Sequence, residues 1–196
     1  RPFEQIRNDC AYMNTNVRLV GVGAGLTYGA QGATHHSTED ISLMRSLPNM
    51  TVVVPSDPYE LEKILEDTAH HQGPIYFRLP KTGEPVISII GSPIHLGKAN
   101  YLVERNDSQI VILFTGNASD IALDVTKRLK EDGHGVDLVS MHTIKPFDYA
   151  ALENLLITKK YIYTLEEHSI FGGLGSVVAE YIAESSHNPV FKRFGL

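Results

Sequence analysis

The segment from residue 17 to residue 47 constrains the fold of this 196-residue chain more than any other. An apolar run at 17–22 is followed by a glycine-rich stretch at 29–33 and then by an amphipathic pattern at 38–47. This order is typical of a buried strand, a loop and a helix, the unit of α/β proteins with parallel sheets. Ser37 and Asp40 have the spacing of a capping box, which predicts that the helix begins there.

His35 directly follows the glycines of this loop. Ligands of open α/β sheets bind beyond the carboxyl ends of the strands, where loop side chains and helix amino ends can contact them. The pattern therefore predicts a functional His35 at the mouth of a sheet. A histidine that lies on a solvated loop without a function is the alternative, and it is the commoner case for a lone histidine.

The rest of the chain repeats the alternation of strand and helix patterns on both sides of a Pro- and Gly-containing stretch at 81–96. Alternation of this kind predicts mostly parallel sheets that are covered by helices. We expect an α/β fold of two small units with mostly parallel sheets flanked by helices, joined by a Pro/Gly-rich linker. The expected strands are 17–22, 51–54, 74–79, 98–104, 110–115, 136–141, 160–165 and 190–194, and the expected helices are 2–13, 38–47, 58–70, 118–131, 149–157 and 173–184.

Composition restricts the partners and the environment of the protein. The chain has 17 Lys and Arg residues against 23 Asp and Glu residues, a net charge of −6, and no basic run, so nucleic acid is not an expected partner. No apolar stretch approaches the roughly 20 residues that span a bilayer, so a membrane protein is not expected. The single cysteine, Cys10, has the spacing of a buried apolar residue and cannot form an internal disulfide, which fits a cytoplasmic protein.

Three other kinds of site receive little support. The glycine clusters at 21–25 and 172–175 lack the spacing of dinucleotide-binding and phosphate-binding loops. For the second cluster, close packing of a helix on its sheet is favoured over a direct ligand role. The adjacent histidines at 35–36 and 70–71 would point apart on an extended chain, and no further ligand spacing completes a metal site. The G-x-S-x-G motif of a nucleophilic serine is absent.

Arg78 lies near the carboxyl end of an expected buried strand, at the sheet edge where His35 should emerge. A guanidinium offers a bidentate donor pair to phosphate or carboxylate, and a buried strand would hold it still. The alternative is a salt bridge to an acidic residue beyond the linker. The pattern alone supports both equally.

Several ordered motifs run along the chain: RPFEQIR at 1–7, GATH at 32–35, ED at 39–40, R-x-x-PNM at 45–50, PSD at 55–57, TIKPFD at 143–148 and GGLGS at 172–176. Together they resemble the thiamin-diphosphate-dependent transketolase family over nearly the whole chain. The resemblance is closest to the separately encoded carboxy-terminal half of bacterial transketolases. It implies a partial pyrimidine-binding domain at 1–80, a linker at 81–96 and a transketolase carboxy-terminal domain at 97–196.

The resemblance implies two-carbon ketol transfer between sugars or sugar phosphates, with thiamin diphosphate as the electron sink. In the family, magnesium and the diphosphate are held by a different domain across a subunit interface. The expected partners are therefore an amino-terminal transketolase half and further copies in a homo-oligomer. The family's glutamate that contacts the pyrimidine ring is expected upstream of Arg1, so this chain alone would be an incomplete transferase.

Individual site residues follow from the same resemblance. His35 matches a histidine that hydrogen-bonds donor hydroxyls and the forming oxyanion, Arg78 an arginine that grips the substrate phosphate, and Arg1 an arginine of the same site. Gln31 stands where well-studied transketolases commonly have an aspartate, and Gly23 where they have a phosphate-binding histidine. Gln31 can still bind a substrate hydroxyl, but the phosphate site is weaker without a second cation. The resemblance thus leads us to expect a substrate other than ordinary pentose phosphates, such as an activated or less phosphorylated sugar.

Two alternatives to a transketolase half stay open. The chain could be a non-catalytic or regulatory interaction subunit that keeps the fold without the chemistry, which the missing glutamate allows. Deoxyxylulose-phosphate synthases and 2-oxo acid dehydrogenase β subunits share the motifs more loosely, and such an enzyme is the second alternative. A glutamate about 30 positions before Arg1, inferred from the family pattern, would favour the enzyme.

Overall fold

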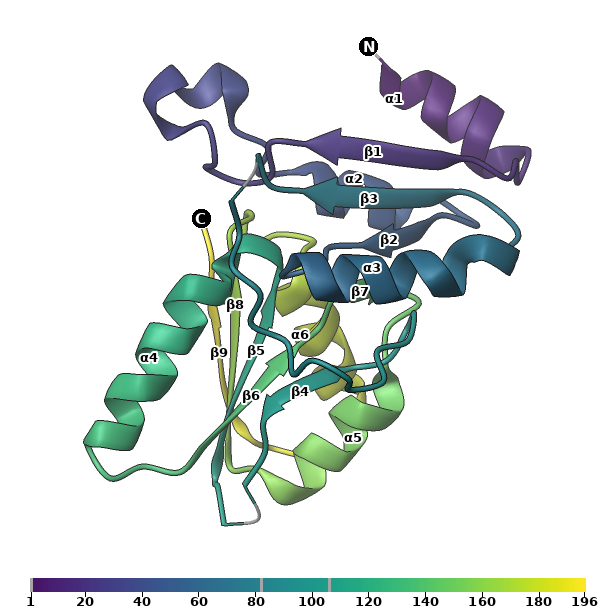
Figure 1. Cartoon of the computed structure of the whole chain (residues 1–196). Helices are drawn as coiled ribbons and strands as arrows, with labels where there is room; N and C mark the ends of the chain where they lie inside the picture. Colours follow the sequence, from purple (N-terminus) through teal and green to yellow (C-terminus); the bar gives the residue numbers. More distant parts are fainter. Residues whose placement is uncertain (1, 82, 106) are drawn as a thin grey trace.

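The protein, described here by a computed structural model of residues 2–81, 83–105 and 107–196, contains two sheets (Figure 1). Arg1, with its predicted substrate contact, lies outside the described residues. The strands are β1 (Arg18–Val22), β2 (Thr51–Val53), β3 (Ile75–Leu79), β4 (Asn100–Val103), β5 (Ile110–Thr115), β6 (Val136–Ser140), β7 (Thr143–Lys145), β8 (Tyr161–Glu166) and β9 (Val190–Phe194). The longer helices are α1 (Pro2–Gln5) continued by η1 (Ile6–Tyr12), α2 (Asp40–Ser46), α3 (Pro58–Asp67), α4 (Ser119–Glu131), α5 (Tyr149–Thr158) and α6 (Leu174–Glu184); the short ones are η2 (Gly29–Gln31), η3 (Ala33–His35), η4 (Thr68–His70) and η5 (Gly116–Ala118).

Both sheets are mostly parallel. The first has the order β1-β3-β2-β7, in which only β7 is antiparallel to its neighbour. The second has the order β4-β6-β5-β8-β9, in which only β4 is antiparallel. The expected α/β fold of two mostly parallel sheets flanked by helices is confirmed. The boundaries of the linker at 81–96 stay a prediction.

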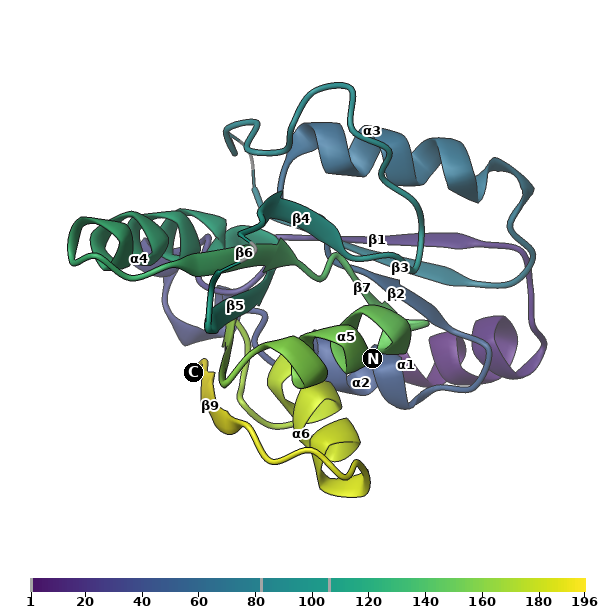
Figure 2. The ribbon, with the colours of Figure 1, turned by 90° about the horizontal axis from the view of Figure 1, so that it is seen from below.

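Helices cover the first sheet on both faces, and each begins for a local reason. Figure 2 shows α3 on one side of this sheet and α2 on the other. The helix α3 starts after Asp57, whose carboxylate accepts the backbone N–H of Glu60 at 2.7 Å, and Pro58 occupies a first-turn position where its missing N–H has no consequence. Its buried Ile64 packs against the sheet residue Phe77. The strand β2, which is buried at all three positions, is covered on both faces, whereas Val20 and Val22 of the edge strand β1 are exposed.

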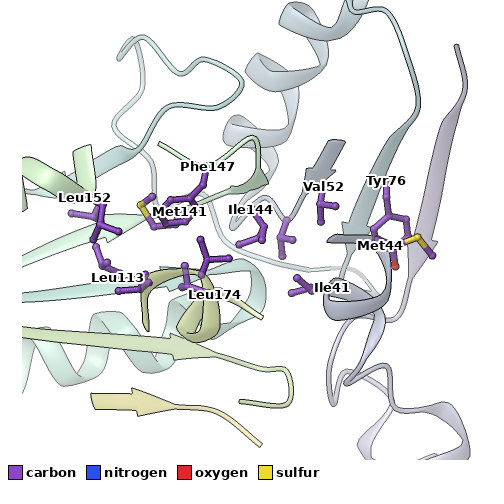
Figure 3. Packing of buried hydrophobic residues seen from close by; sticks show 14 of the residues in the cluster. Ile41, Met44, Val52, Tyr76, Leu113, Met141, Ile144, Phe147, Leu152 and Leu174 are labelled. Carbon is purple, nitrogen blue, oxygen red and sulfur yellow. The ribbon is translucent and has the colours of Figure 1, made fainter. Parts of the chain in front are cut away.

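A single hydrophobic core joins the two halves of the chain (Figure 3). It contains Ile41 and Val52 from the first half and Ile144 and Leu174 from the second, all at most 2% exposed. The second half also supplies β7, which pairs with β2 at the end of the first sheet. Sequence patterning missed β7 because Thr143–Lys145 contains one apolar residue and forms a strand only through its pairing with the distant β2.

The predicted capping box at the start of α2 is wrong. The helix begins at Asp40, its cap residue is Glu39, and no side chain caps its first turn. Ser37 cannot act as the cap because its backbone is paired with Gly25 at the base of the preceding loop. The carboxylate of Asp40 is used elsewhere, as described below.

No helix within the described ranges combines the length and the apolar character that crossing a membrane requires.

Candidate active site where the two sheets meet

The carboxyl end of β1 continues into a loop that carries the predicted site residues. The backbone N–H groups of Gly23 and Ala24 donate to the Leu79 carbonyl at the end of β3, at 2.9 and 3.0 Å. Two further backbone hydrogen bonds, of 2.9 and 3.0 Å, join Gly25 to Ser37. We call residues 25–37 the rim loop. Its base is fixed to the sheet. In its outer part, residues 29–31 and 33–35 are exposed, and Gly32 between them is half-buried.

His35 ends the short helix η3 on the exposed part of the rim loop. Its Nδ1 lies 3.1 Å from the hydroxyl oxygen of Thr34, and its ring meets that of Tyr28 edge-on with 6.3 Å between centroids. These contacts restrict the rotation of the imidazole, and Nε2 has no hydrogen-bond partner within the described part of the chain. Gln31 is exposed on the same loop. The structure thus brings the two predicted residues together with polar atoms that can reach a ligand.

Arg78 lies at the same rim, but its side chain is only 1% exposed. Its Nε donates to the Asp40 carboxylate at 2.9 Å, and its Nη2 donates to the carbonyls of Ser37 at 2.7 Å and Glu167 at 3.0 Å. Its Nη1 is 3.5 Å from the side-chain oxygen of Asn117. The carboxylate partner therefore lies in the first half and not beyond the linker. Binding of a substrate phosphate by this guanidinium stays a prediction.

Asp40 connects Arg78 to a second buried group. The Tyr76 hydroxyl donates to its carboxylate at 2.7 Å. Burial, followed by the neighbouring carboxylate of Asp40, raises the pKa of Tyr76 far above its ordinary value, so this hydroxyl remains a donor. A negative charge in the first turn of α2 is also favourable for the helix dipole. These contacts form a rigid support directly beneath the rim loop.

The end of β8 carries another buried pair, Glu166 and His168. The Glu166 carboxylate accepts the backbone N–H groups of Leu174 and Gly175 at 2.8 Å each, at the start of α6. Burial raises the pKa of Glu166 to about 7, although these two hydrogen bonds act in the opposite direction. Burial lowers the pKa of His168, whose Nε2 accepts the backbone N–H of Ser42 at 3.4 Å. Both side chains fix helices and do not face solvent.

The glycine cluster at 172–175 allows α6 to approach the sheet. A Cβ on Gly173 would overlap the Glu166 carboxylate. A Cβ on Gly175 would lie 2.8 Å from the Arg193 side chain and 2.9 Å from the Thr164 hydroxyl, which is closer than real Cβ contacts. The prediction of close helix packing at this cluster is confirmed.

Sequence reasoning missed two polar residues that reach the rim loop from the second half. Asn117 follows β5 and Glu167 follows β8, so the carboxyl ends of both sheets meet here. Glu167 accepts the backbone N–H of Leu26 at 2.9 Å, and the Asn117 amide also donates to Glu167. Glu167 directly follows β8 and Asn117 comes two positions after the end of β5, and this closeness to strand ends was the available signal. The hydrophobic pattern of the individual strands does not show how the two sheets are oriented relative to each other.

His36, next to His35 in the rim loop, has a buried ring nitrogen. Nε2 of His36 is buried and makes no hydrogen bond within the described residues, although it neighbours the exposed His35. Buried polar atoms of this kind are normally satisfied by a hydrogen bond. The described residues contain no cluster of three or more His, Cys, Asp or Glu side chains that could hold a metal ion.

Comparison with known families assigns both halves of the chain. The pyrimidine binding domain of transketolase matches residues 1–84, and the C-terminal domain of transketolase matches residues 97–196. The chain belongs to the transketolase family. The resemblance given by the sequence motifs is therefore confirmed, and the family is one that depends on thiamin diphosphate.

Individual relatives agree with this assignment. A putative transketolase C-terminal section from Methanocaldococcus jannaschii is 38% identical over 198 residues, which cover all of this chain and 61% of the relative. A subunit of apulose-4-phosphate transketolase from Actinobacillus succinogenes is 36% identical, over all of this chain and 62% of the relative. A solved structure described as a split gene transketolase, in an inactive tetramer, has a TM-score of 0.87 at 34% identity, over 98% of this chain and 62% of that one. The chain thus spans about three fifths of these transketolase relatives.

Proposed function

We propose that this transketolase-family chain is the carboxy-terminal part of an enzyme that transfers a two-carbon ketol unit between sugars. The observation that carries the proposal is His35, an exposed imidazole on a loop whose base is hydrogen-bonded to the sheet rim. A preorganised donor of this kind suits a reaction in which negative charge develops on a carbonyl oxygen. Two relatives are described as transketolase subunits, which supports an enzyme that is divided between two chains.

Thiamin diphosphate, when bound, supplies the electron sink for cleavage and formation of the carbon–carbon bond. In the tautomer that this role requires, the proton of the imidazole is on Nε2, and Nδ1 accepts the hydrogen bond from the Thr34 hydroxyl 3.1 Å away. From there His35 donates a hydrogen bond to the substrate oxygen, and this bond strengthens as charge develops. Gln31 binds a substrate hydroxyl from the same loop.

The proposal assigns further substrate contacts to Arg1 and Arg78. Nη1 is the least engaged nitrogen of Arg78, so a phosphate would be bound there. Because Arg78 is buried and already paired with Asp40, it can bind a phosphate only weakly. This supports a substrate other than an ordinary pentose phosphate.

The remaining parts of the active site belong, in this proposal, to other polypeptide segments. An amino-terminal half holds the diphosphate and Mg²⁺. The assembled enzyme is a homo-oligomer that works in the cytoplasm. The domain division at 80 and 97 is part of the same proposal.

The test mixes the chain with its amino-terminal partner, thiamin diphosphate and Mg²⁺ and measures ketol transfer from phosphorylated, unphosphorylated and nucleotide-linked sugars. We expect transfer only from the complete mixture, with a preference for a donor other than xylulose 5-phosphate. No transfer, together with no heat of cofactor binding in calorimetry, would indicate a non-catalytic subunit. A clear preference for xylulose 5-phosphate would overturn only the substrate class. In a parallel mixture with pyruvate as the donor and glyceraldehyde 3-phosphate as the acceptor, formation of 1-deoxyxylulose 5-phosphate with release of CO2 would indicate a synthase.

A further inference from the structure

Glu167 is the residue through which the second half of the chain holds the rim loop. It directly follows β8 and is half-buried. Its Oε2 accepts the backbone N–H of Leu26 at 2.9 Å, on the first arm of the loop. The side-chain amide of Asn117, after β5, also donates to Oε2. A carboxylate with two donors from different segments is fixed in position, because charged hydrogen bonds are stronger than neutral ones.

The same group is connected to the other arm of the loop. Nη2 of Arg78 donates to the backbone carbonyl of Glu167 at 3.0 Å and to that of Ser37 at 2.7 Å. The Asn117 amide lies 3.4 Å from the carbonyl of Ala24, just before the loop. Both arms of the rim loop are therefore tied to the residues that follow β5 and β8.

Gly25 leaves room for this contact. Its φ is +59°, which other residues rarely adopt, and a Cβ there would overlap the Glu167 carboxylate. The glycine at the base of the rim loop and the glutamate in the second half thus form a matched pair. The exposed outer part of the loop, by contrast, has few contacts of its own, so its position depends on its base.

We propose that Glu167, supported by Asn117, is a positioning residue that sets where the rim loop places His35 and Gln31. This inference rests on the proposed function of His35. Glu167 acts through the backbone of Leu26 and does not contact substrate. Misplacement of a reacting group by about 1 Å can lower a rate by about 10²-fold, so the position of the loop is a determinant of turnover.

The experiment compares Glu167→Ala and Glu167→Gln in the intact chain assembled with its partner. Glu180→Ala is the matched control, because Glu180 on α6 also joins the two halves, through Arg45, but does not contact the rim loop. For E167A we expect the amides of Gly25 and Leu26 to exchange hydrogen about 10-fold faster or more. We also expect kcat to fall by about 10- to 100-fold with a much smaller change in KM. The amide oxygen of E167Q can accept the same hydrogen bonds, so this variant should recover most of both losses, and E180A should change neither.

The outcomes separate this inference from the proposed function. If E167A keeps the exchange rates and kcat of the parent, or if E180A changes them equally, the positioning role is wrong. If the parent mixture transfers no ketol unit, the proposed function fails, while the exchange rates still decide whether Glu167 holds the loop. Should E167A not fold, Asn117→Ala removes one donor to the carboxylate and is judged by the same two measurements.

Discussion

The rim loop and the support beneath it contain similar residue types in very different states. His35 and Gln31 are exposed, and their polar atoms have few partners in the protein. Arg78 and Asp40, directly beneath the loop, form a buried ion pair that also includes the hydroxyl of Tyr76. The difference teaches that a polar side chain at a sheet edge is available to a ligand when its polar atoms lack partners in the protein. It has a structural role when other protein groups already hydrogen-bond to it.

The largest effect is expected for Arg78→Ala, which removes the ion pair beneath the rim loop. Replacing Arg78 with Ala leaves the Asp40 carboxylate, which is only 14% exposed, without its ion partner, so we expect the free energy of unfolding to fall by about 3 kcal/mol. The measurement is urea denaturation of parent and variant. Arg45→Ala is the control, since its more exposed pair with Glu180 is worth about 1 kcal/mol or less.

A result opposite to this would be informative. If R78A unfolds at the urea concentration of the parent and its only effect is a higher KM for phosphorylated sugars, Arg78 has no structural role and the contrast between loop and support is wrong.

A second prediction concerns the pH dependence of the support. Glu166 has a pKa raised to about 7 in the folded protein, so the fold favours its protonated form. Its contribution to stability is complete below the unfolded pKa of 4.5 and is lost as the pH rises through 7. Relative to Glu166→Gln, the parent should therefore lose about 3 kcal/mol between pH 4.5 and pH 8.

Denaturation of both proteins across this pH range measures the difference directly. Burial also lowers the pKa values of His142 and His168, but these histidines are present in parent and variant alike, so their effect largely cancels. A difference that does not change with pH would show that Glu166 is charged in the folded protein.

The smallest effect is expected at the second loop residue. Gln31→Ala removes one neutral hydrogen bond to substrate, so kcat/KM should fall by about 2- to 10-fold with no change in stability. Gln72→Ala is a suitable control, since Gln72 is exposed before β3, at the opposite end of the first sheet. The measurement is the steady-state kinetics of both variants. If Gln31→Ala and Gln72→Ala have the same kcat/KM, Gln31 does not bind substrate.

Much of the fold was predictable because the buried strands are continuous apolar runs. The expected strand at 110–115 coincides with β5, which is such a run. The expected strand at 190–194 coincides with β9, whose residues instead alternate between exposed and half-buried. The arrival of His35 at a sheet rim followed from the order of strand, glycine loop and helix. Antiparallel β7 and the pairing of Ser37 with Gly25 were not predictable, because both depend on contacts between segments that local periodicity does not describe.

The candidate site divides in the same way. Motifs identified His35 and Arg78, but only the packing shows that the first is exposed and the second is paired with Asp40. Glu167 was visible in the sequence beside a glycine cluster, yet its contact with Leu26 spans 141 positions and requires the meeting of two sheets. Spacing along the chain therefore selected the candidate residues, and tertiary structure separated the exposed candidate from the buried one.

The most direct test of the central claim is the kinetics of His35→Ala in the assembled enzyme, with His70→Ala, an exposed histidine in η4 at the other end of the first sheet, as the control. We predict that H35A lowers kcat by about 10²-fold or more, changes KM less, and unfolds at the same urea concentration as the parent. The control should match the parent in all three measurements. An H35A enzyme that keeps its kcat, or that changes only KM, would contradict the assignment of the rim loop as the place where charge on the substrate is stabilised.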